Sequence, residues 1–453
     1  MSEQTKRIFE IRDITNEVSP TFCLAKWHHT TINLHMGQTH SCYHPPPHDI
    51  PLDELAVNPS ALHNTNRKKA EREQMLNGQK PDGCKYCWNV ESLGDTHISD
   101  RMIRNASIMT KDRFHEIRNN PWNYNVRPEY IEVAFSSECN FKCGYCHPRH
   151  STSFFNEIKN HGPYSMVKNH RSDIDWFRIY EEDTNPYVDA WWKWWPDVSQ
   201  TLNILRITGG EPLMHKSTWR LFDLLREEPL PQLELNINSN LGVKSAMVER
   251  LVENVNDVVS NNKIRKFKLF TSLDTWGTRA EYLRTGLKLD LWERNMDTYV
   301  HGTGADLTFM CTFNILTVTS FTDFLAKVLE WRKKYNTPDH NKIRFDTPYL
   351  KEPLQYDMHI LPKAEFLPYF DQTLEFIQQN LDDADNTKFT TLEYEKFRRV
   401  RDYFATEQYT EERVTEGRRD FHNWFDEYDR RRGVNLLDTF PEMTNFYNLC
   451  KAS

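Results

Sequence analysis

The sequence predicts an α/β protein with a parallel sheet, because strand-like and helix-like stretches alternate between about residues 131 and 350. Short apolar runs rich in Val, Ile, Phe and Thr indicate strands. They cover residues 130–137, 202–208, 233–239, 267–273, 307–316 and 342–350. Helical spacing of apolar residues appears between strands at 244–259 and 321–335. Such alternation implies right-handed crossovers, and six strands suit either an open doubly wound sheet or a partial barrel.

Composition bounds the size and the class of the protein. A chain of 453 residues can form two or three domains. Hydrophobic residues make up 38% of the chain and aromatic residues 13%, which is enough to bury a core in an otherwise polar sequence. The formal net charge is −8 at pH 7, so we expect no nucleic-acid partner.

The first residues and the hydropathy of the chain indicate a compartment. The segment MSEQTKRIFEIRD has no apolar core of signal-peptide length, and no stretch approaches the roughly 20 apolar residues of a membrane span. We therefore expect a cytoplasmic protein without a membrane partner, in which thiols stay reduced. Nine cysteines in such a compartment indicate metal ligands or catalysis before disulfides.

Three regions are predicted along the chain. Residues 1–125 form a module rich in Cys and His, with little regular periodicity. Residues 126–355 form the core, interrupted at 150–200 by a segment whose Trp cluster indicates a local aromatic core. Residues 356–453 form a C-terminal helical extension. We expect its charged faces, through Arg432, to be solvated surface.

The strongest chemical signal is the C-x3-C-x2-C spacing of Cys139, Cys143 and Cys146, directly after the first predicted strand. Four thiolates normally complete a [4Fe–4S] cluster, so three leave one iron open to an outside ligand. The alternative is a zinc site with His147 or His150 as its fourth ligand.

A second signal follows the second predicted strand, which ends in TGGEP at residues 208–212. Glycines at a strand end let the backbone approach a ligand closely. Ligands in barrel enzymes lie at the carboxyl ends of the strands. We therefore expect this loop and the cysteine loop to face the same cavity.

The two motifs together, CNFKCGYC and GGEP, resemble the radical S-adenosylmethionine (SAM) superfamily. The resemblance covers roughly residues 128–350 and implies a partial (β/α)6 barrel core. It also implies that the open iron binds SAM through its amino and carboxylate groups. One electron from a reductant such as flavodoxin or ferredoxin then cleaves SAM to methionine and a 5′-deoxyadenosyl radical. That radical abstracts hydrogen from a substrate.

The resemblance assigns further residues to SAM. Gly209, Gly210 and Glu211 match the segment that receives the SAM amino group. Tyr145, just before the third cysteine, matches a position next to the adenine. These roles are implied by the family motif alone.

Later strand ends carry the remaining matches to SAM-binding positions. Asn238 and Ser239 close the third predicted strand, where family members often contact SAM. Ser272 and Asp274 match a segment near the ribose and carboxylate, and Arg284 matches an arginine that commonly pairs with the SAM carboxylate. The structural alternatives are strand-end capping for Ser239, Ser272 and Asp274, and a surface helix charge for Arg284.

The N-terminal region holds a second cysteine group. Cys23 and Cys42 stand apart, and Cys84 and Cys87 form a C-x2-C pair after a helix predicted at about 60–78. One interpretation is a structural zinc site with four cysteine ligands. The other is an auxiliary [4Fe–4S] cluster, because the pattern resembles the twitch or SPASM-type module. In many radical SAM proteins that module follows the core, whereas here it precedes it. The radical SAM motifs in the same chain favour the iron–sulfur interpretation.

The leading hypothesis is therefore a radical SAM enzyme with an auxiliary cluster. The alternative is a zinc-stabilised binding protein in which both cysteine groups are structural, and a third possibility is a degenerate family member that binds a cluster without SAM chemistry. The auxiliary module favours a peptide or protein substrate. The sequence does not identify the atom that is attacked.

Overall fold

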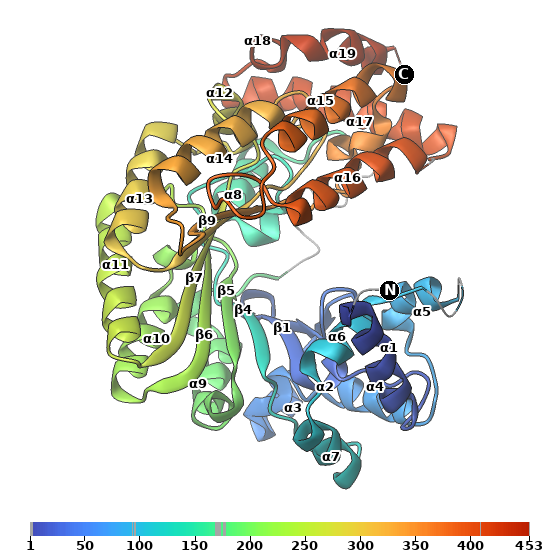
Figure 1. Ribbon diagram of the computed structural model, residues 1–453, viewed down its shortest axis with the longest axis vertical. Coiled ribbons are helices and arrows are strands. Elements are labelled where there is room, and N and C mark those ends of the chain that lie inside the picture. Colours follow the sequence, from blue (N-terminus) through green and yellow to red (C-terminus); the bar gives the residue numbers. More distant parts are fainter. Residues whose placement is uncertain are drawn as a thin grey trace. The chain divides into compact units, whose positions relative to one another are not determined.

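The computed structural model describes residues 3–92, 94, 97–167, 174, 178–407 and 409–452. These residues contain a nine-stranded mixed sheet in the order β3-β2-β1-β4-β5-β6-β7-β8-β9 (Figure 1). The strands are β1 (His29–Asn33), β2 (Gln38–His40), β3 (His48–Asp49), β4 (Tyr130–Ala134), β5 (Ile204–Thr208), β6 (Leu230–Ser239), β7 (Ile264–Ser272), β8 (Asp306–Met310) and β9 (Ile343–Asp346). The sheet is not closed, and β3 and β9 form its edges. The predicted α/β class is confirmed.

The six predicted strands are β4 to β9, and they lie next to one another in chain order. The pairs β4–β5, β7–β8 and β8–β9 are parallel. A doubly wound sheet reverses its strand order at a switch point, whereas a barrel adds each strand beside the last. The consecutive order therefore decides between the two arrangements that the sequence left open, in favour of a partial barrel.

Three short strands of the N-terminal region extend this sheet. Strand β1 pairs in parallel with β4, and β2 and β3 add antiparallel strands beyond it. Strand β1 reads HTTIN, and β2 and β3 have three and two residues. Such short polar strands lack the alternating apolar pattern by which strands are predicted, which explains why the sequence did not reveal them.

The chain divides into two compact units, and each unit combines segments that are separated in the sequence. The first comprises residues 1–136, 179–209 and 228–235, and the second comprises residues 137–178, 210–227 and 236–453. The four N-terminal cysteines belong to the first unit. The loop of Cys139 to Cys146 belongs to the second unit, together with the C-terminal helices.

The first unit buries aromatic side chains between its helices and its strands. Its helices are α1 (Glu3–Asn16), α2 (Ala25–His28), α3 (Leu52–Val57), α4 (Asn66–Leu76), α5 (Lys85–Glu91), α6 (Asp100–Ile108), α7 (Lys111–Asn119) and α9 (Pro186–Val198). Trp191 of α9 is fully buried and meets Phe135, which follows β4, at a ring-centroid distance of 5.7 Å. The Trp cluster is thus a packing element, while part of the 150–200 segment lies outside the described residues.

In the second unit, the outer face of the strands packs against helices. Its helices are α8 (Thr152–His161), α10 (Lys216–Glu227), α11 (Ser245–Ser260), α12 (Thr278–Leu283), α13 (Leu289–Gly302), α14 (Phe321–Tyr335), α15 (Lys363–Gln379), α16 (Thr391–Thr406), α17 (Glu411–Arg432), α18 (Leu436–Thr439) and α19 (Thr444–Lys451). Phe309 of β8 is buried and stacks on Trp331 of α14 at 5.0 Å. Met310 is the next residue of β8, and Ser272 of β7 pairs with it. Both point to the opposite face of the sheet and are partly exposed.

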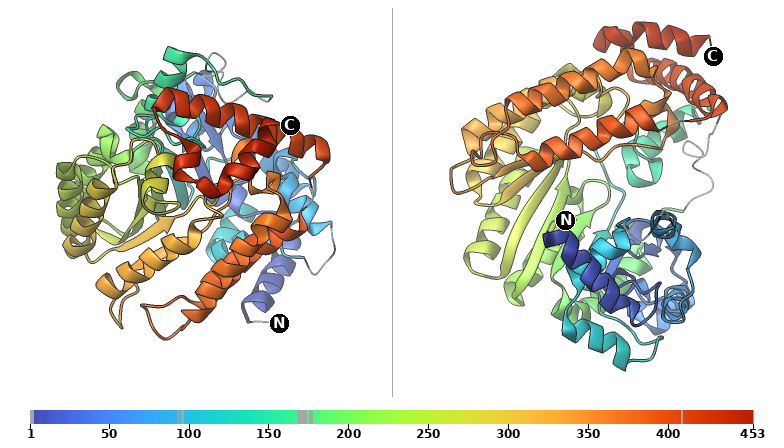
Figure 2. Two further views of the ribbon diagram at one scale, coloured as in Figure 1. Left: turned by 90° about the horizontal axis from the view of Figure 1, so that it is seen from above. Right: turned by 45° about the vertical axis from the view of Figure 1, so that its right-hand side comes forward.

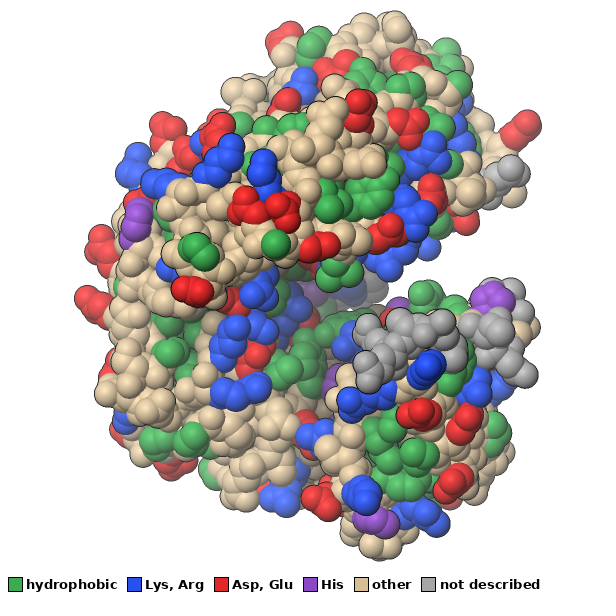
Figure 3. Space-filling model, in the orientation of Figure 1, with side chains coloured by type: hydrophobic (Ala, Val, Ile, Leu, Met, Phe, Trp, Pro, Cys, Tyr) green, Lys and Arg blue, Asp and Glu red, His purple; other side chains and the backbone are tan. Residues whose placement is uncertain are grey.

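The C-terminal helices form a packed layer of the second unit. Helices α15 and α16 lie side by side (Figure 2), and Phe370 stacks on Phe404 at 4.7 Å. Phe421 of α17 meets Phe446 of α19 at 5.0 Å. On the surface seen in Figure 3, basic and acidic side chains are interspersed. Every helix among the described residues is too short or too polar to cross a membrane.

Candidate metal centres

The three-cysteine loop is fixed by hydrogen bonds to the start of α8. The backbone N–H of Cys139 donates to Thr152 Oγ1 at 3.1 Å, and its carbonyl accepts from Ser153 Oγ at 2.7 Å. The N–H of Cys146 donates to the carbonyl of Cys143 at 3.0 Å, which curls the loop back on itself. Cys143 is buried, and the other two cysteines are half-buried.

The three thiols influence one another. Burial, reinforced by the neighbouring Cys143, raises the pKa of Cys139 well above its usual value. Thiolates crowded in a buried loop repel one another, and a bound metal centre removes that penalty. Among the described residues, no three His, Cys, Asp or Glu side chains converge as tightly as one metal ion requires.

The two glycines of the TGGEP segment let it approach the chain that leads into the cysteine loop. Gly209 has φ +116°, and a Cβ atom there would lie 2.7 Å from the carbonyl oxygen of Ser136. A Cβ atom on Gly210 would lie 2.2 Å from the carbonyl oxygen of Glu138. That same carbonyl accepts from the N–H of Glu211 at 2.7 Å. The close approach that the glycines permit is therefore, in the structure, an approach to the protein's own backbone.

Glu211 joins this segment to the end of β6. Its buried carboxylate accepts from Ser239 Oγ at 2.8 Å, from the N–H of Asn240 at 2.6 Å and from the N–H of Leu213 at 3.0 Å. Burial raises the pKa of Glu211 to about 7. Asn240 in turn donates from Nδ2 to Cys139 Sγ at 3.9 Å. Sequence reasoning did not single out Asn240, although it directly follows the predicted ligand residues of this strand.

A buried polar chain links Cys143 to Tyr145. The Asp274 carboxylate accepts from Tyr145 Oη at 2.6 Å, from Arg284 Nη2 at 2.8 Å and from the N–H of Thr312 at 2.8 Å. Arg284 also donates from Nη1 to Cys143 Sγ at 3.8 Å. Asp274 and Arg284 are 1% and 5% exposed, so Arg284 is not the surface helix charge that was its structural alternative.

The remaining positions assigned by the resemblance lie at strand ends of the same unit. Asn238 lies near the end of β6 and Ser272 ends β7, and both are half-buried. Ser272 pairs in register with Met310 of β8. The structure thus brings Glu211 and Ser239 into contact, and it brings Tyr145, Asp274 and Arg284 together.

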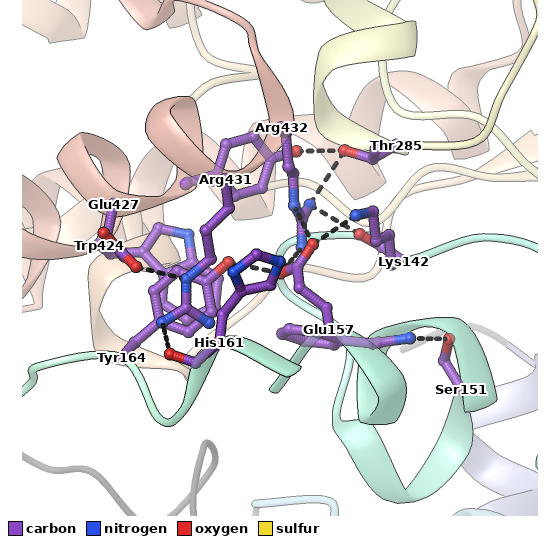
Figure 4. Close-up of polar contacts among 12 residues, drawn as sticks. Lys142, Ser151, Glu157, His161, Tyr164, Thr285, Trp424, Glu427, Arg431 and Arg432 are labelled. Atoms are coloured by element: carbon purple, nitrogen blue, oxygen red, sulfur yellow. Dashed lines mark hydrogen bonds and ion pairs between the residues drawn. The ribbon is translucent and has the colours of Figure 1, made fainter. Parts of the chain in front are cut away.

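Contacts from the end of α17 hold the cysteine loop, and the sequence did not predict them (Figure 4). We call Arg432, Glu157 and Lys142 the C-terminal clamp. The side chain of Arg432 is fully buried and donates to both carboxylate oxygens of Glu157 at 3.0 Å and to the carbonyl of Lys142 at 2.8 Å. Lys142 lies between the first two cysteines, and its Nζ pairs with Glu157 at 2.5 Å. The expectation of a solvated charged face is therefore wrong at Arg432 and at Arg431, whose side chain is 2% exposed.

The clamp combines charge and aromatic contacts that make burial of these groups tolerable. Burial alone would raise the pKa of Glu157, but the hydrogen bonds and charge of Arg432 outweigh it and lower the pKa to about 2. Tyr164 donates to Glu157 at 2.6 Å and stacks on Trp424 at 4.0 Å. Buried ions need such partners, and the charge pattern of the sequence alone does not show which partners they will have.

The four N-terminal cysteines line one pocket of the first unit. Cys23 precedes α2, Cys42 follows β2, and Cys84 and Cys87 lie at the start of α5. All four line the same pocket of this unit. Helix α4, predicted at about 60–78, spans Asn66–Leu76.

Two buried cations share this pocket. Lys26 is 2% exposed and pairs with Glu71 at 2.5 Å, and Arg101 is 4% exposed and pairs with Glu91 at 2.9 Å. Burial raises the pKa of Cys84, and the charge of Lys26 opposes that rise. The pocket thus gathers four thiols, and the two cations beside them are each paired with a carboxylate.

Comparisons with known proteins give partial likenesses. No protein-family model matches the chain. A GTP 3′,8-cyclase from Nautilia profundicola is 27% identical over 112 residues, which is 25% of this chain and 27% of that protein. The chain thus matches only about a quarter of the length of that relative.

Two solved structures show a distant likeness. One is described as native anSMEcpe with bound AdoMet and Kp18Cys peptide, with a TM-score of 0.32 and 16% identity over 55% of this chain and 60% of that chain. The other is described as native anSMEcpe with bound AdoMet, with a TM-score of 0.31 and 15% identity over 70% of this chain and 99% of that chain.

Proposed function

We propose that this chain is a radical SAM enzyme in which Cys139, Cys143 and Cys146 hold a [4Fe–4S] cluster that binds SAM. The observation that carries the proposal is the three-thiol loop after β4, the first of six strands that lie side by side in chain order. The loop supplies three thiols, so a [4Fe–4S] cluster held there would keep one iron open to SAM. Bound there with SAM, the cluster supplies the one-electron cleavage that yields a 5′-deoxyadenosyl radical.

The protein's own residues hold this loop and orient the cofactor. Asn240 and Arg284 each direct an N–H toward a cysteine sulfur, and such hydrogen bonds would orient the thiolates that hold a cluster. Glu211 is saturated by three donors, so its carboxylate positions the end of β6. We assign the SAM amino group to the backbone of the Gly209–Glu211 segment. We assign the rest of SAM to the strand ends that carry Ser239 and Ser272.

We further propose an auxiliary [4Fe–4S] cluster at Cys23, Cys42, Cys84 and Cys87. The buried cations in that pocket support an anionic thiolate centre, and four cysteine ligands would leave no iron open to substrate. Its role would be electron transfer. Zinc at the same four thiols is the alternative.

The reaction partners follow from this assignment. The electron would come from a small reductant of the flavodoxin or ferredoxin class. The resemblance of the four-cysteine module to twitch-type modules favours a peptide or protein substrate. The partial likeness to a GTP 3′,8-cyclase supports an enzyme over a binding protein.

Anaerobic reconstitution with iron and sulfide tests the proposal. We expect about eight irons per chain in two cubanes, and release of 5′-deoxyadenosine when SAM and dithionite are added. Cys143→Ala should abolish that release, whereas Cys311→Ala, a change at a buried cysteine outside both groups, should preserve it. A colourless protein that retains only zinc, or full activity in Cys143→Ala, would refute the proposal.

A further inference from the structure

Arg284 is held beside Cys143 by the backbone on both sides of each residue. The N–H of Lys142 donates to the carbonyl of Thr285 at 2.9 Å, and the N–H of Gly144 donates to the carbonyl of Leu283 at 3.3 Å. These two bonds join the segment that contains Cys143 to the segment that contains Arg284, one on each side of the two residues. The proximity of the guanidinium to the thiol is therefore built into the main chain.

Packing leaves little freedom around the pair. A Cβ atom on Gly144 would lie 1.9 Å from Tyr356 Oη, so only glycine fits next to Cys143. Cys143 is 9% exposed and Arg284 is 5% exposed. Charges act strongly on one another in such a water-poor environment, because little solvent screens them.

Two of the N–H donors of Arg284 already have partners in the protein. Nη1 points to Cys143 Sγ at 3.8 Å, Nη2 points to Asp274 at 2.8 Å, and the guanidinium stands 5.4 Å from the centroid of the Tyr145 ring. Nε is buried and has no partner among the described residues. The two terminal nitrogens of Arg284 could together bind a SAM carboxylate. In the structure they donate separately, to a thiol and to a carboxylate of the protein itself.

We infer that Arg284 is a positioning residue that sets the electron affinity of the three-cysteine centre through the Cys143 thiolate, with Asp274 holding and partly neutralising it. The inference rests on the proposed function, because it requires a cluster at these cysteines. One electron from the reductant makes the cluster more negative by one charge. A cation that donates to a ligand sulfur stabilises that reduced form, and a nearby carboxylate opposes it.

Two variants should shift the reduction potential in opposite directions. Arg284→Gln removes the cation and should make the potential of the cluster more negative. Asp274→Asn removes the opposing carboxylate and should make it more positive. Arg284→Lys keeps the charge and should stay closer to the original protein than Arg284→Gln does.

The measurement is a redox titration of reconstituted protein without SAM, followed by electron paramagnetic resonance. The signal that changes when SAM is later added identifies the three-cysteine cluster. Opposite shifts in the two variants would support the inference, and Asp274→Asn alone suffices if Arg284→Gln does not assemble a cluster. Potentials that stay unchanged, with SAM binding lost in Arg284→Gln, would overturn it and make Arg284 a SAM ligand. Absence of any cluster in the unaltered protein would instead refute the proposed function.

Discussion

Lys26 and Arg284 are buried cations that each lie beside a cysteine thiol, and they belong to different units of the chain. Burial alone would lower the pKa of Lys26, but Cys84 and Glu71 outweigh it and raise the pKa. Arg284 donates to Cys143 in a comparable way. A buried cation costs free energy unless an anion faces it; Glu71 faces Lys26 and Asp274 faces Arg284, so each cation can stay buried beside its cysteine thiol.

Lys26→Met should weaken the four-cysteine centre. The change removes the cation of the pocket and leaves Glu71 with the more distant Arg67, at 3.6 Å. We expect fewer irons retained per chain during anaerobic gel filtration, and a free energy of unfolding lower by about 2 kcal/mol. Lys111→Met, at an exposed position of α7 in the same unit, serves as the control. Equal iron retention in the two variants would contradict the assignment.

At the scale of elements, α17 connects the C-terminal layer to the cysteine loop. Its last residue, Arg432, reaches both Glu157 at α8 and the Lys142 carbonyl between two cysteines. The helix ends at Gly433, which adopts φ +64° as a left-handed cap. The side chain of Arg432 is thus buried, although the surrounding sequence is strongly charged.

Arg432→Met should loosen the three-cysteine loop. It leaves Glu157 buried with weaker compensation, so we expect a free energy of unfolding lower by about 3 kcal/mol, and weaker iron retention at these cysteines. Arg430→Met changes a side chain that is 64% exposed in the same helix, and it should leave the free energy of unfolding nearly unchanged. Denaturant unfolding and iron analysis measure both effects. Matching losses in the two variants would argue against the clamp.

The clamp also predicts a pH dependence. Arg432 helps to lower the pKa of Glu157 from 4.5 to about 2. A lowered carboxyl pKa contributes stability above its unfolded-state value and loses it as the pH falls through the folded-state value. The free energy of unfolding should therefore fall between about pH 4.5 and pH 2, and Arg432→Met should show a shallower fall.

At the scale of the whole molecule, each compact unit carries one cysteine group. Cys84 and its three partners belong to the first unit, and Cys143 and its two partners belong to the second. The cysteines of each group come entirely from one unit. Loss of one centre should therefore leave the residues of the other in place.

Single cysteine variants should separate the two centres. Cys84→Ala is expected to lose about four irons and to keep SAM cleavage with dithionite as reductant. Cys143→Ala is expected to lose about four irons together with SAM cleavage. Iron and sulfide analysis, with 5′-deoxyadenosine assays, measures the outcome. Loss of all iron in either variant would show that the two centres depend on each other.

The sequence by itself determined the features that are local along the chain. The spacing of Cys139, Cys143 and Cys146 and the periodicity of β4 to β9 depend on neighbouring residues, so they could be recognised without a structure. Helix α14 was predicted at its observed bounds for the same reason.

Tertiary structure alone decided which distant residues meet. Arg284 lies 141 positions from Cys143, and Arg432 lies 290 positions from Lys142. No periodicity connects such pairs, because their contact depends on how strands and helices pack. The same holds for the pocket that gathers Cys23, Cys42, Cys84 and Cys87. A charged side chain becomes a surface group or a buried clamp only once the chain has folded around it.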